Sequence, residues 1–307
     1  MAPRLFIFGL GFSGRAVARH LAAEGWEVVG TSRSGEAPNP PGIRVFAFDR
    51  DHPLPPDALD GATHLLSTVP PDGLGDPVIA AVAGRAFQWA GYLSTTGVYG
   101  DRGGDRVDET TPPNPANERS ARRLAAERAW LESGLPVHVF RLAGIYGPGR
   151  SAIDSVRDGT ARRVVKPGQV FGRIHVDDIA GAVAASIARP HPGTVYNLAD
   201  DDPAPPQDVV LHACRLLGVA PPPEIPWDQA EPTLSPMARS FYAENKRVAN
   251  DRIKAETDFH LTYPTYREGL TAILNRPSPG AGSASVAGAS TAPETDGSRP
   301  TVPDRNA

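Results

Sequence analysis

Three glycines near the N-terminus have the spacing of a phosphate-binding turn. Gly9, Gly11 and Gly14 fit the pattern G-x-G-x-x-G, with Phe12 and Ser13 between the second and third. The first glycine permits a tight turn, the second lets the backbone approach a pyrophosphate, and the third lets the following helix pack closely on the strand. Amides exposed at the start of that helix, together with its dipole, favour phosphate groups. The turn therefore predicts a dinucleotide site.

The residues after the second expected strand favour NADP(H) over NAD(H). An NAD site usually places Asp or Glu there to hold the ribose 2′-hydroxyl. This chain has Thr31, Ser32 and Arg33 instead, so hydroxyls and a cation are available for a 2′-phosphate. Arg33 can alternatively be a solvated loop residue. Asp49, after the third expected strand, either hydrogen-bonds the adenine amine or only ends its strand.

The elements around the glycines support this interpretation. Residues 5–8 form a short continuous apolar run, which is typical of a buried parallel strand. Residues 15–24 have the periodicity of a helix, and residues 27–31 form a second strand. The three segments make one βαβ unit of about thirty residues, which is the context that the glycine pattern requires.

Strands and helices continue to alternate further along the chain. Later strands are expected at 45–48, 64–69, 92–96 and 137–142, and helices at 76–91 and 118–133. This alternation predicts an α/β fold with a Rossmann-type, doubly wound parallel sheet.

The chain is expected to divide into three parts. Residues 1–150 form the dinucleotide-binding core. Residues 151–276 form mostly a smaller C-terminal substrate domain, with strands returning to the core. Residues 277–307 contain hardly any large apolar side chains and are expected to be disordered.

Composition limits the remaining possibilities. The 307 residues have a formal net charge of −4, which gives no indication of a nucleic-acid groove. A single cysteine, Cys214, allows neither an internal disulfide nor a multi-cysteine metal site. No 18-residue apolar run exists, and the apolar run at 5–8 is too short for a signal peptide. We therefore expect a cytoplasmic protein with no membrane segment and no metal.

Three further motifs follow the glycine turn in a specific order. They are Leu-Ser-Thr-Thr-Gly-Val-Tyr-Gly at 93–100, Arg-Leu-Ala-Gly-Ile-Tyr-Gly-Pro-Gly-Arg at 141–150 and Ile-His-Val-Asp-Asp at 174–178. Over about residues 4–274 the chain resembles the extended and atypical short-chain dehydrogenase/reductases, the NAD-dependent epimerase/dehydratase family. This resemblance implies a Rossmann domain with a smaller C-terminal substrate domain.

The resemblance also implies residue roles. Thr95 stands where the family has its catalytic Ser or Thr, whose hydroxyl hydrogen-bonds the substrate carbonyl or hydroxyl at the reacting carbon. Thr68 and Val69 end the fourth strand, where the family lines the path of the cofactor. Many members of the family dimerise through helices beside the sheet, so a homodimer is possible.

The chain departs from the family at its Tyr-x-x-x-Lys motif. One register places Arg119 and Arg123 at these positions, and a register shifted by one residue places Glu118 and Arg122 there. Arginine stays protonated near neutral pH and is a poor proton shuttle, although Arg123 could still hydrogen-bond ribose or phosphate. The two arginines of the first register repel unless an anionic substrate or a carboxylate, from Glu118 or Glu127, lies between them. A solvated charged helix face is the alternative.

Other residues could replace the missing acid. Tyr99 and Tyr146 lie on loops expected at the C-terminal edge of the sheet, where ligands bind in such folds, and Glu118 could act as a base. Two functions therefore remain. The first is an NAD(P)-dependent oxidoreductase or epimerase/dehydratase-like enzyme acting on a carbonyl, alcohol or sugar-nucleotide substrate, which the retention of Thr95 favours. The second is a non-catalytic NADP(H)-binding redox sensor or scaffold.

Overall fold

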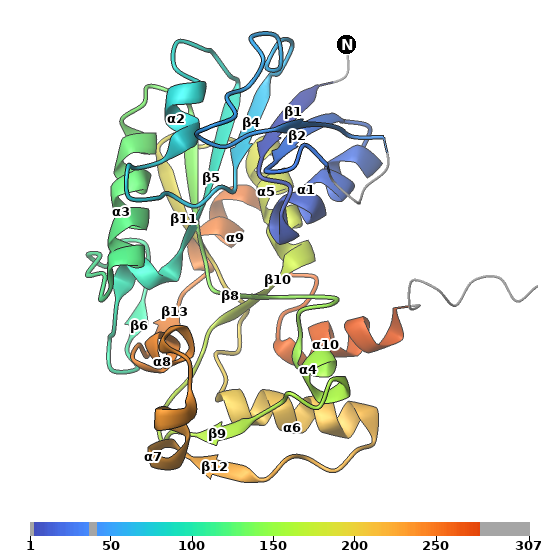
Figure 1. Cartoon of the computed structure of the whole chain (residues 1–307), viewed down its shortest axis with the longest axis vertical. Helices are drawn as coiled ribbons and strands as arrows, with labels where there is room; N and C mark the ends of the chain where they lie inside the picture. Colours follow the sequence, from blue (N-terminus) through green and yellow to red (C-terminus); the bar gives the residue numbers. More distant parts are fainter. Residues whose placement is uncertain (1–2, 37–41, 277–307) are drawn as a thin grey trace, which may run out of the picture. The chain divides into compact units, whose positions relative to one another are not determined.

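Seven parallel strands form the central sheet of the computed structural model, which describes residues 3–36 and 42–276 (Figure 1). Their order across the sheet is β3-β2-β1-β4-β5-β7-β11, and every neighbouring pair is parallel. The strands are β1 (Arg4–Phe8), β2 (Glu27–Ser32), β3 (Arg44–Ala47), β4 (His64–Ser67), β5 (Trp89–Thr95), β7 (Val137–Leu142) and β11 (Thr194–Leu198). The predicted doubly wound parallel sheet is confirmed.

Helices cover both faces of this sheet, which explains why its strands are continuously apolar. On one face lie α1 (Phe12–Ala23) and α5 (Val176–Ala188), whose apolar side chains share a buried cluster with Leu5 and Ile7 of β1. On the other lie α2 (Pro77–Ala81) and α3 (Glu118–Leu131), which pack against Phe6 and Phe8 of the same strand. Figure 1 shows α3 and α1 on opposite sides of the strands.

The helix expected over 76–91 is shorter than predicted. It ends at Ala81, and residues from Trp89 onward already belong to β5. Val82 is the C-cap of α2, and Gly84, at a left-handed φ of +73°, interrupts the helical conformation before β5.

The second half of the chain adds short elements beyond the C-terminal edge of the sheet. Helices α4 (Ala152–Arg157), α6 (Pro206–Leu217) and α10 (Tyr266–Asn275) share a third buried cluster. The other helices are α7 (Trp227–Ala230), α8 (Pro236–Tyr242) and α9 (Asp251–Thr257), with 3-10 turns η1 (Thr96–Tyr99) and η2 (Glu231–Thr233).

Three two-stranded parallel pairs complete the fold. They are β8 (Gly144–Tyr146) with β10 (Arg173–His175), β9 (Arg163–Val165) with β12 (Glu224–Pro226), and β6 (Arg106–Val107) with β13 (Arg247–Val248). Residues up to Leu274 belong to one unit, so a boundary near residue 150 stays a prediction. The tail expected at 277–307 lies outside the described residues, and none of the helices in the described part is both long and apolar enough to cross a membrane.

Candidate functional site

The glycine turn follows β1 and leads directly into α1. A Cβ atom on Gly9 would lie 2.6 Å from Thr68 Oγ1, and one on Gly14 would collide with the Gly9 carbonyl oxygen. Both positions therefore exclude side chains because of their own neighbours. At Gly11, by contrast, no protein atom lies within 4 Å of where a Cβ would be. The backbone at Gly11 is thus open to a ligand.

The start of α1 suits a phosphate group. Gly11 is the N-cap residue, no side chain caps the helix, and its first turn contains no acidic residue. The first amides of the helix are therefore left for an anion. Phe12 and Ser13 occupy the first two positions of this helix. The residues present fit the pyrophosphate of a dinucleotide.

Hydrogen bonds from neighbouring strands hold the turn. Thr68 Oγ1 donates to the Gly9 carbonyl at 2.6 Å, and Val69 also contacts this turn. The Gly9 amide donates to Thr31 Oγ1 at 3.0 Å. Thr31 is buried and its hydroxyl accepts this hydrogen bond. Of the residues expected to contact a 2′-phosphate, only Ser32 and Arg33 are therefore left to do so.

Those two residues and Asp49 lie at or just after the C-terminal ends of β2 and β3. The Ser32 hydroxyl donates to the Glu36 carbonyl at 2.7 Å, and Arg33 is exposed with no ion pair among residues 3–36 and 42–276. Asp49 Oδ1 accepts hydrogen bonds from the His52 ring and the His52 amide, both at 2.8 Å. The His52 side chain holds the pKa of Asp49 below its usual value. Asp49 therefore closes a local turn, and an additional contact with adenine stays a prediction.

A cavity of about 730 Å³ lies beyond the C-terminal end of β5. Its wall includes the end of β5, the first turn of α3, the loop after β7, and α8. Arg150 joins this cavity to the glycine turn, because its guanidinium carbon lies 5.7 Å from the ring centroid of Phe12. The cavity thus begins beside the residues that suit the pyrophosphate.

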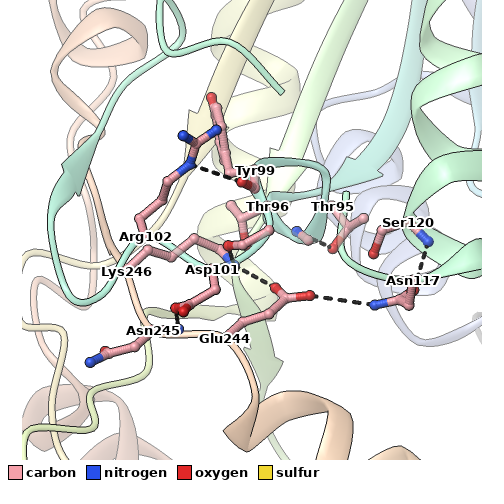
Figure 2. Close-up of polar contacts among 12 residues, drawn as sticks. Thr95, Thr96, Tyr99, Asp101, Arg102, Asn117, Ser120, Glu244, Asn245 and Lys246 are labelled. Carbon is pink, nitrogen blue, oxygen red and sulfur yellow. Dashed lines mark hydrogen bonds and ion pairs between the residues drawn. The ribbon is translucent and has the colours of Figure 1, made fainter. Parts of the chain in front are cut away.

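Thr95 lines this cavity, as expected from the motif that contains it. Its Oγ1 accepts the Gly97 amide at 3.1 Å, which leaves the hydroxyl proton free to donate to a ligand. Ser120 also lines the cavity, and a Cβ on Gly97 would lie 2.9 Å from Ser120 Oγ and 3.3 Å from Thr95 Oγ1. Two hydroxyls therefore flank Gly97 (Figure 2).

The structure does not bring Tyr99 to the cavity wall. Its ring is fully buried, and its hydroxyl donates to Asn197 Oδ1 at 2.8 Å and accepts from Arg141 at 3.0 Å. Arg141 in turn makes a buried ion pair with Glu127 at 2.7 Å. Burial raises the pKa of Tyr99. This corrects the expectation that its loop would present the phenol to a ligand, and Glu127 is not available to neutralise the arginines of α3.

The charged side chains at the start of α3 point to different surroundings. Glu118 is exposed, pairs with Arg122 and does not line the cavity, contrary to the role considered for it as a base. Arg119 does line the cavity and lies 5.6 Å from the ring centroid of Phe241 on α8. Arg123 points to the sheet, where it donates to the Leu93 carbonyl at 2.8 Å. The two arginines of the Tyr-x-x-x-Lys register therefore have separate surroundings.

A buried ion pair that the sequence did not indicate completes the wall. Lys246 Nζ lies 2.5 Å from Glu244 Oε2 and donates to the Gly100 carbonyl at 2.8 Å. The two side chains are only 10% and 13% exposed, and both line the cavity. Asn117, the N-cap of α3, donates to Glu244 Oε1 at 3.4 Å (Figure 2). No group of metal-ligating side chains is found in the part of the chain that the structure describes.

Comparisons with known proteins identify relatives of this chain. The model of the NAD dependent epimerase/dehydratase family matches residues 76–199. Protein YeeZ of Escherichia coli K12 is 34% identical, over 71% of this chain and 85% of that protein. A 3-diazoavenalumate denitrifying reductase from a Streptomyces species is 31% identical, over 53% of this chain and 58% of that protein.

Solved structures extend the likeness to most of the chain. A functionally unknown conserved protein from Silicibacter pomeroyi is 50% identical, with a TM-score of 0.81, covering 89% of this chain and 98% of that one. A human epimerase family protein in complex with NADPH shares the fold at 19% identity and a TM-score of 0.69, covering 88% of this chain and 98% of that one.

Proposed function

Because this chain belongs to the NAD-dependent epimerase/dehydratase family, we propose that it is an NADP(H)-dependent oxidoreductase acting on a small anionic molecule. The observation that carries this proposal is the place of Thr95. Its hydroxyl lies at the C-terminal end of β5, lines the cavity and has a proton free to donate. A substrate carbonyl held there would have its oxygen polarised by the hydroxyl as the carbon is reduced.

The cofactor would bind at the start of α1. The amides after Gly11 would hold the pyrophosphate, and a bound reduced nicotinamide supplies the hydride. Ser32 and Arg33, which has no ion pair with any described residue, support a 2′-phosphate and hence NADP(H). One fold relative was solved with NADPH, and a UDP-glucuronic acid 4-epimerase from Bacillus cereus was solved with NAD, so direct binding must decide the preference.

Cations in the cavity support an anionic substrate. Arg119, Arg150 and Arg162 line it, and none of the three forms an ion pair with any residue placed in the structure. Guanidinium groups that line a cavity without a carboxylate partner attract carboxylates or phosphates. The Streptomyces relative, a reductase by name, is consistent with reduction as the direction of the reaction.

A carbonyl compound with and without a carboxylate tests this function. The assay follows NADPH oxidation with benzoylformate and with its methyl ester, which removes only the negative charge. We expect turnover of benzoylformate, a higher KM for the ester, and weaker activity with NADH. Thr95→Ala is expected to lower kcat by about 100-fold or more, whereas Thr95→Ser, which keeps the hydroxyl and the bond to Gly97, retains activity.

Absence of turnover with retained NADPH binding would favour a second function, a non-catalytic NADP(H) sensor or scaffold. The specific observation that favours it is the loss of the family's proton-donating tyrosine, since the motif's two positions hold Arg119 and Arg123 in one register and Glu118 and Arg122 in the other. A redox sensor must bind NADPH and NADP⁺ with different affinities, which calorimetry measures. Light scattering at micromolar concentration would test whether this chain forms a homodimer, as many members of the family do.

A further inference from the structure

The reaction proposed above needs a proton that the first turn of α3 cannot supply in the usual way. In one register of the motif Arg119 stands at the position of the family's tyrosine, and an arginine does not release its proton near neutral pH. In the shifted register Glu118 stands there, but it is exposed, pairs with Arg122 and does not line the cavity. We propose that Lys246 is the proton donor to the substrate oxygen held by Thr95, and that Glu244 positions Lys246. This assignment rests on the proposed function.

Two of the three N–H donors of the Lys246 ammonium group bond to the protein, and the third is left for a ligand. Its ammonium group has three N–H donors. One is directed to the Gly100 carbonyl at 2.8 Å and one to Glu244 Oε2 at 2.5 Å. No acceptor for the third is present among the residues that the structure describes, and Lys246 lines the cavity. The third donor is therefore available to a ligand.

Glu244 connects this lysine to the helix from which the family delivers its proton. Glu244 Oε1 accepts from Asn117 Nδ2 at 3.4 Å, and Asn117 Oδ1 accepts the Ser120 amide at 2.9 Å. The ion pair thus adjoins the first turn of α3, where Ser120 lies near Thr95. In Figure 2 dashed lines connect Lys246 to Glu244, Glu244 to Asn117, and Asn117 to the Ser120 amide.

The chain segment of the pair is fixed to the loop after β5. β13 pairs with β6 in parallel, and the Asn245 amide donates to Asp101 Oδ1 at 2.8 Å. The Asn245 carbonyl accepts the amides of Arg102 and Gly104, both at 3.0 Å. These bonds place Lys246 beside Gly100, five residues after Thr95.

Other titratable groups in the cavity wall are less suited. Burial raises the pKa values of Tyr146, Tyr242 and Tyr266. The Tyr146 hydroxyl oxygen is also buried against Gly269 of α10, where an added Cβ would lie 2.0 Å from it. Asp154 accepts the Ser151 hydroxyl at 2.6 Å on α4, among the C-terminal elements.

The proton balance of the step is simple. The hydride adds to the carbonyl carbon, and the π-electron pair of the C=O bond moves to oxygen. That oxygen takes a proton from Lys246 Nζ and becomes a hydroxyl. The lysine is left as a neutral amine, with Glu244 still accepting from it, and water returns the proton. The cofactor is oxidised, and the carbonyl is reduced to an alcohol.

The test compares lysine variants of the full chain with NADPH and benzoylformate. Lys246→Ala and Lys246→Met are expected to lower kcat by about 100-fold or more, with the NADPH dissociation constant unchanged within about threefold. Added methylamine is expected to restore kcat in Lys246→Ala, because it can occupy the vacated space and donate the proton. Lys254→Ala, which removes an exposed ion pair with Asp201, serves as the matched control.

Glu244→Gln tests the positioning role. It is expected to lower kcat by about tenfold with little change in KM, and methylamine is not expected to restore it. If Lys246→Ala fails to fold, Lys246→Arg keeps the charge and the contacts but cannot release a proton, and its kcat must fall as far as that expected for Lys246→Ala.

Each outcome decides the assignment. If the wild type turns over and the Lys246 variants retain its kcat, the lysine assignment alone is refuted. It is also refuted if Lys246→Ala loses kcat and methylamine does not restore it. A wild-type protein that binds NADPH but reduces neither benzoylformate nor its ester refutes the proposed function and this assignment together.

Discussion

Replacing Gly11 by alanine should separate cofactor binding from folding. Nothing in the protein lies within 4 Å of the added Cβ, and the backbone of Gly11, at φ −76° and ψ −156°, is accessible to any residue. The folded state should therefore lose at most about 1 kcal/mol, since alanine is a poorer N-cap than glycine. The methyl group would instead occupy the space that the pyrophosphate needs.

The loss of affinity follows from the hydrogen bonds at that helix start. Displacing the phosphate from one charge-assisted bond costs about 1.5–3 kcal/mol, which corresponds to a rise in Kd of about 10- to 150-fold. Calorimetry with NADPH measures Kd, and thermal denaturation measures stability.

Two matched glycines calibrate the result. Gly73→Ala, another site with nothing within 4 Å, should change neither quantity, whereas Gly14→Ala should lower the stability and raise Kd, because its Cβ collides with the Gly9 carbonyl. Gly11→Ala that binds NADPH within threefold of wild type would refute the pyrophosphate site.

Three further changes test the buried hydroxyl of Tyr99, the cofactor contact proposed for Arg33, and the buried carboxyl of Asp200, which follows β11. Tyr99→Phe removes a bond to Asn197 and one from Arg141; it should lower the free energy of unfolding by about 2–4 kcal/mol yet leave kcat within about twofold, and a 100-fold loss of kcat in a stable variant would contradict this. Arg33→Gln should weaken NADPH binding by about tenfold while leaving NADH binding unchanged, measured by calorimetry; equal effects on both would remove the 2′-phosphate contact. Burial raises the pKa of Asp200 to about 8, so the folded state holds a proton that the unfolded state has lost above about pH 4, and stability should fall between pH 4 and 8. Asp200→Asn should be more stable than wild type at pH 8 and similar to it at pH 4 in denaturant titrations, and an unchanged pH dependence would refute this reasoning.

Local pattern was enough to predict the sheet and the glycine turn. The apolar run of β1, the glycines and the next strand lie within about thirty residues. Their arrangement depends on packing between neighbouring segments, and the spacing of apolar residues in the sequence indicates it. The same holds for Thr95, which a short motif places at the end of β5.

The surroundings of Tyr99 and the Glu244–Lys246 pair could not be predicted from the sequence, because they depend on contacts between distant parts of the chain. Tyr99 lies in a motif that suggests chemistry, but its hydroxyl bonds to Arg141 of β7 and Asn197 of β11, strands that occur later in the chain. The pair of Glu244 and Lys246 reaches α3 only because β13 pairs with β6, across about 140 residues. A two-residue strand has no periodicity to detect.

The two arginines of α3 also explain why a new proton donor would come from outside that helix. Arg123 donates to the Leu93 carbonyl within β5, two residues before Thr95, so it stabilises the end of the strand that carries this hydroxyl. Arg119 is directed to the cavity, where a fixed positive charge can bind an anion but cannot deliver a proton. A site in which the helix contributes charge and position therefore needs its acid from another element. The lysine of the 244–248 segment meets that need because it touches the loop after β5 and, through Glu244, the N-cap of α3.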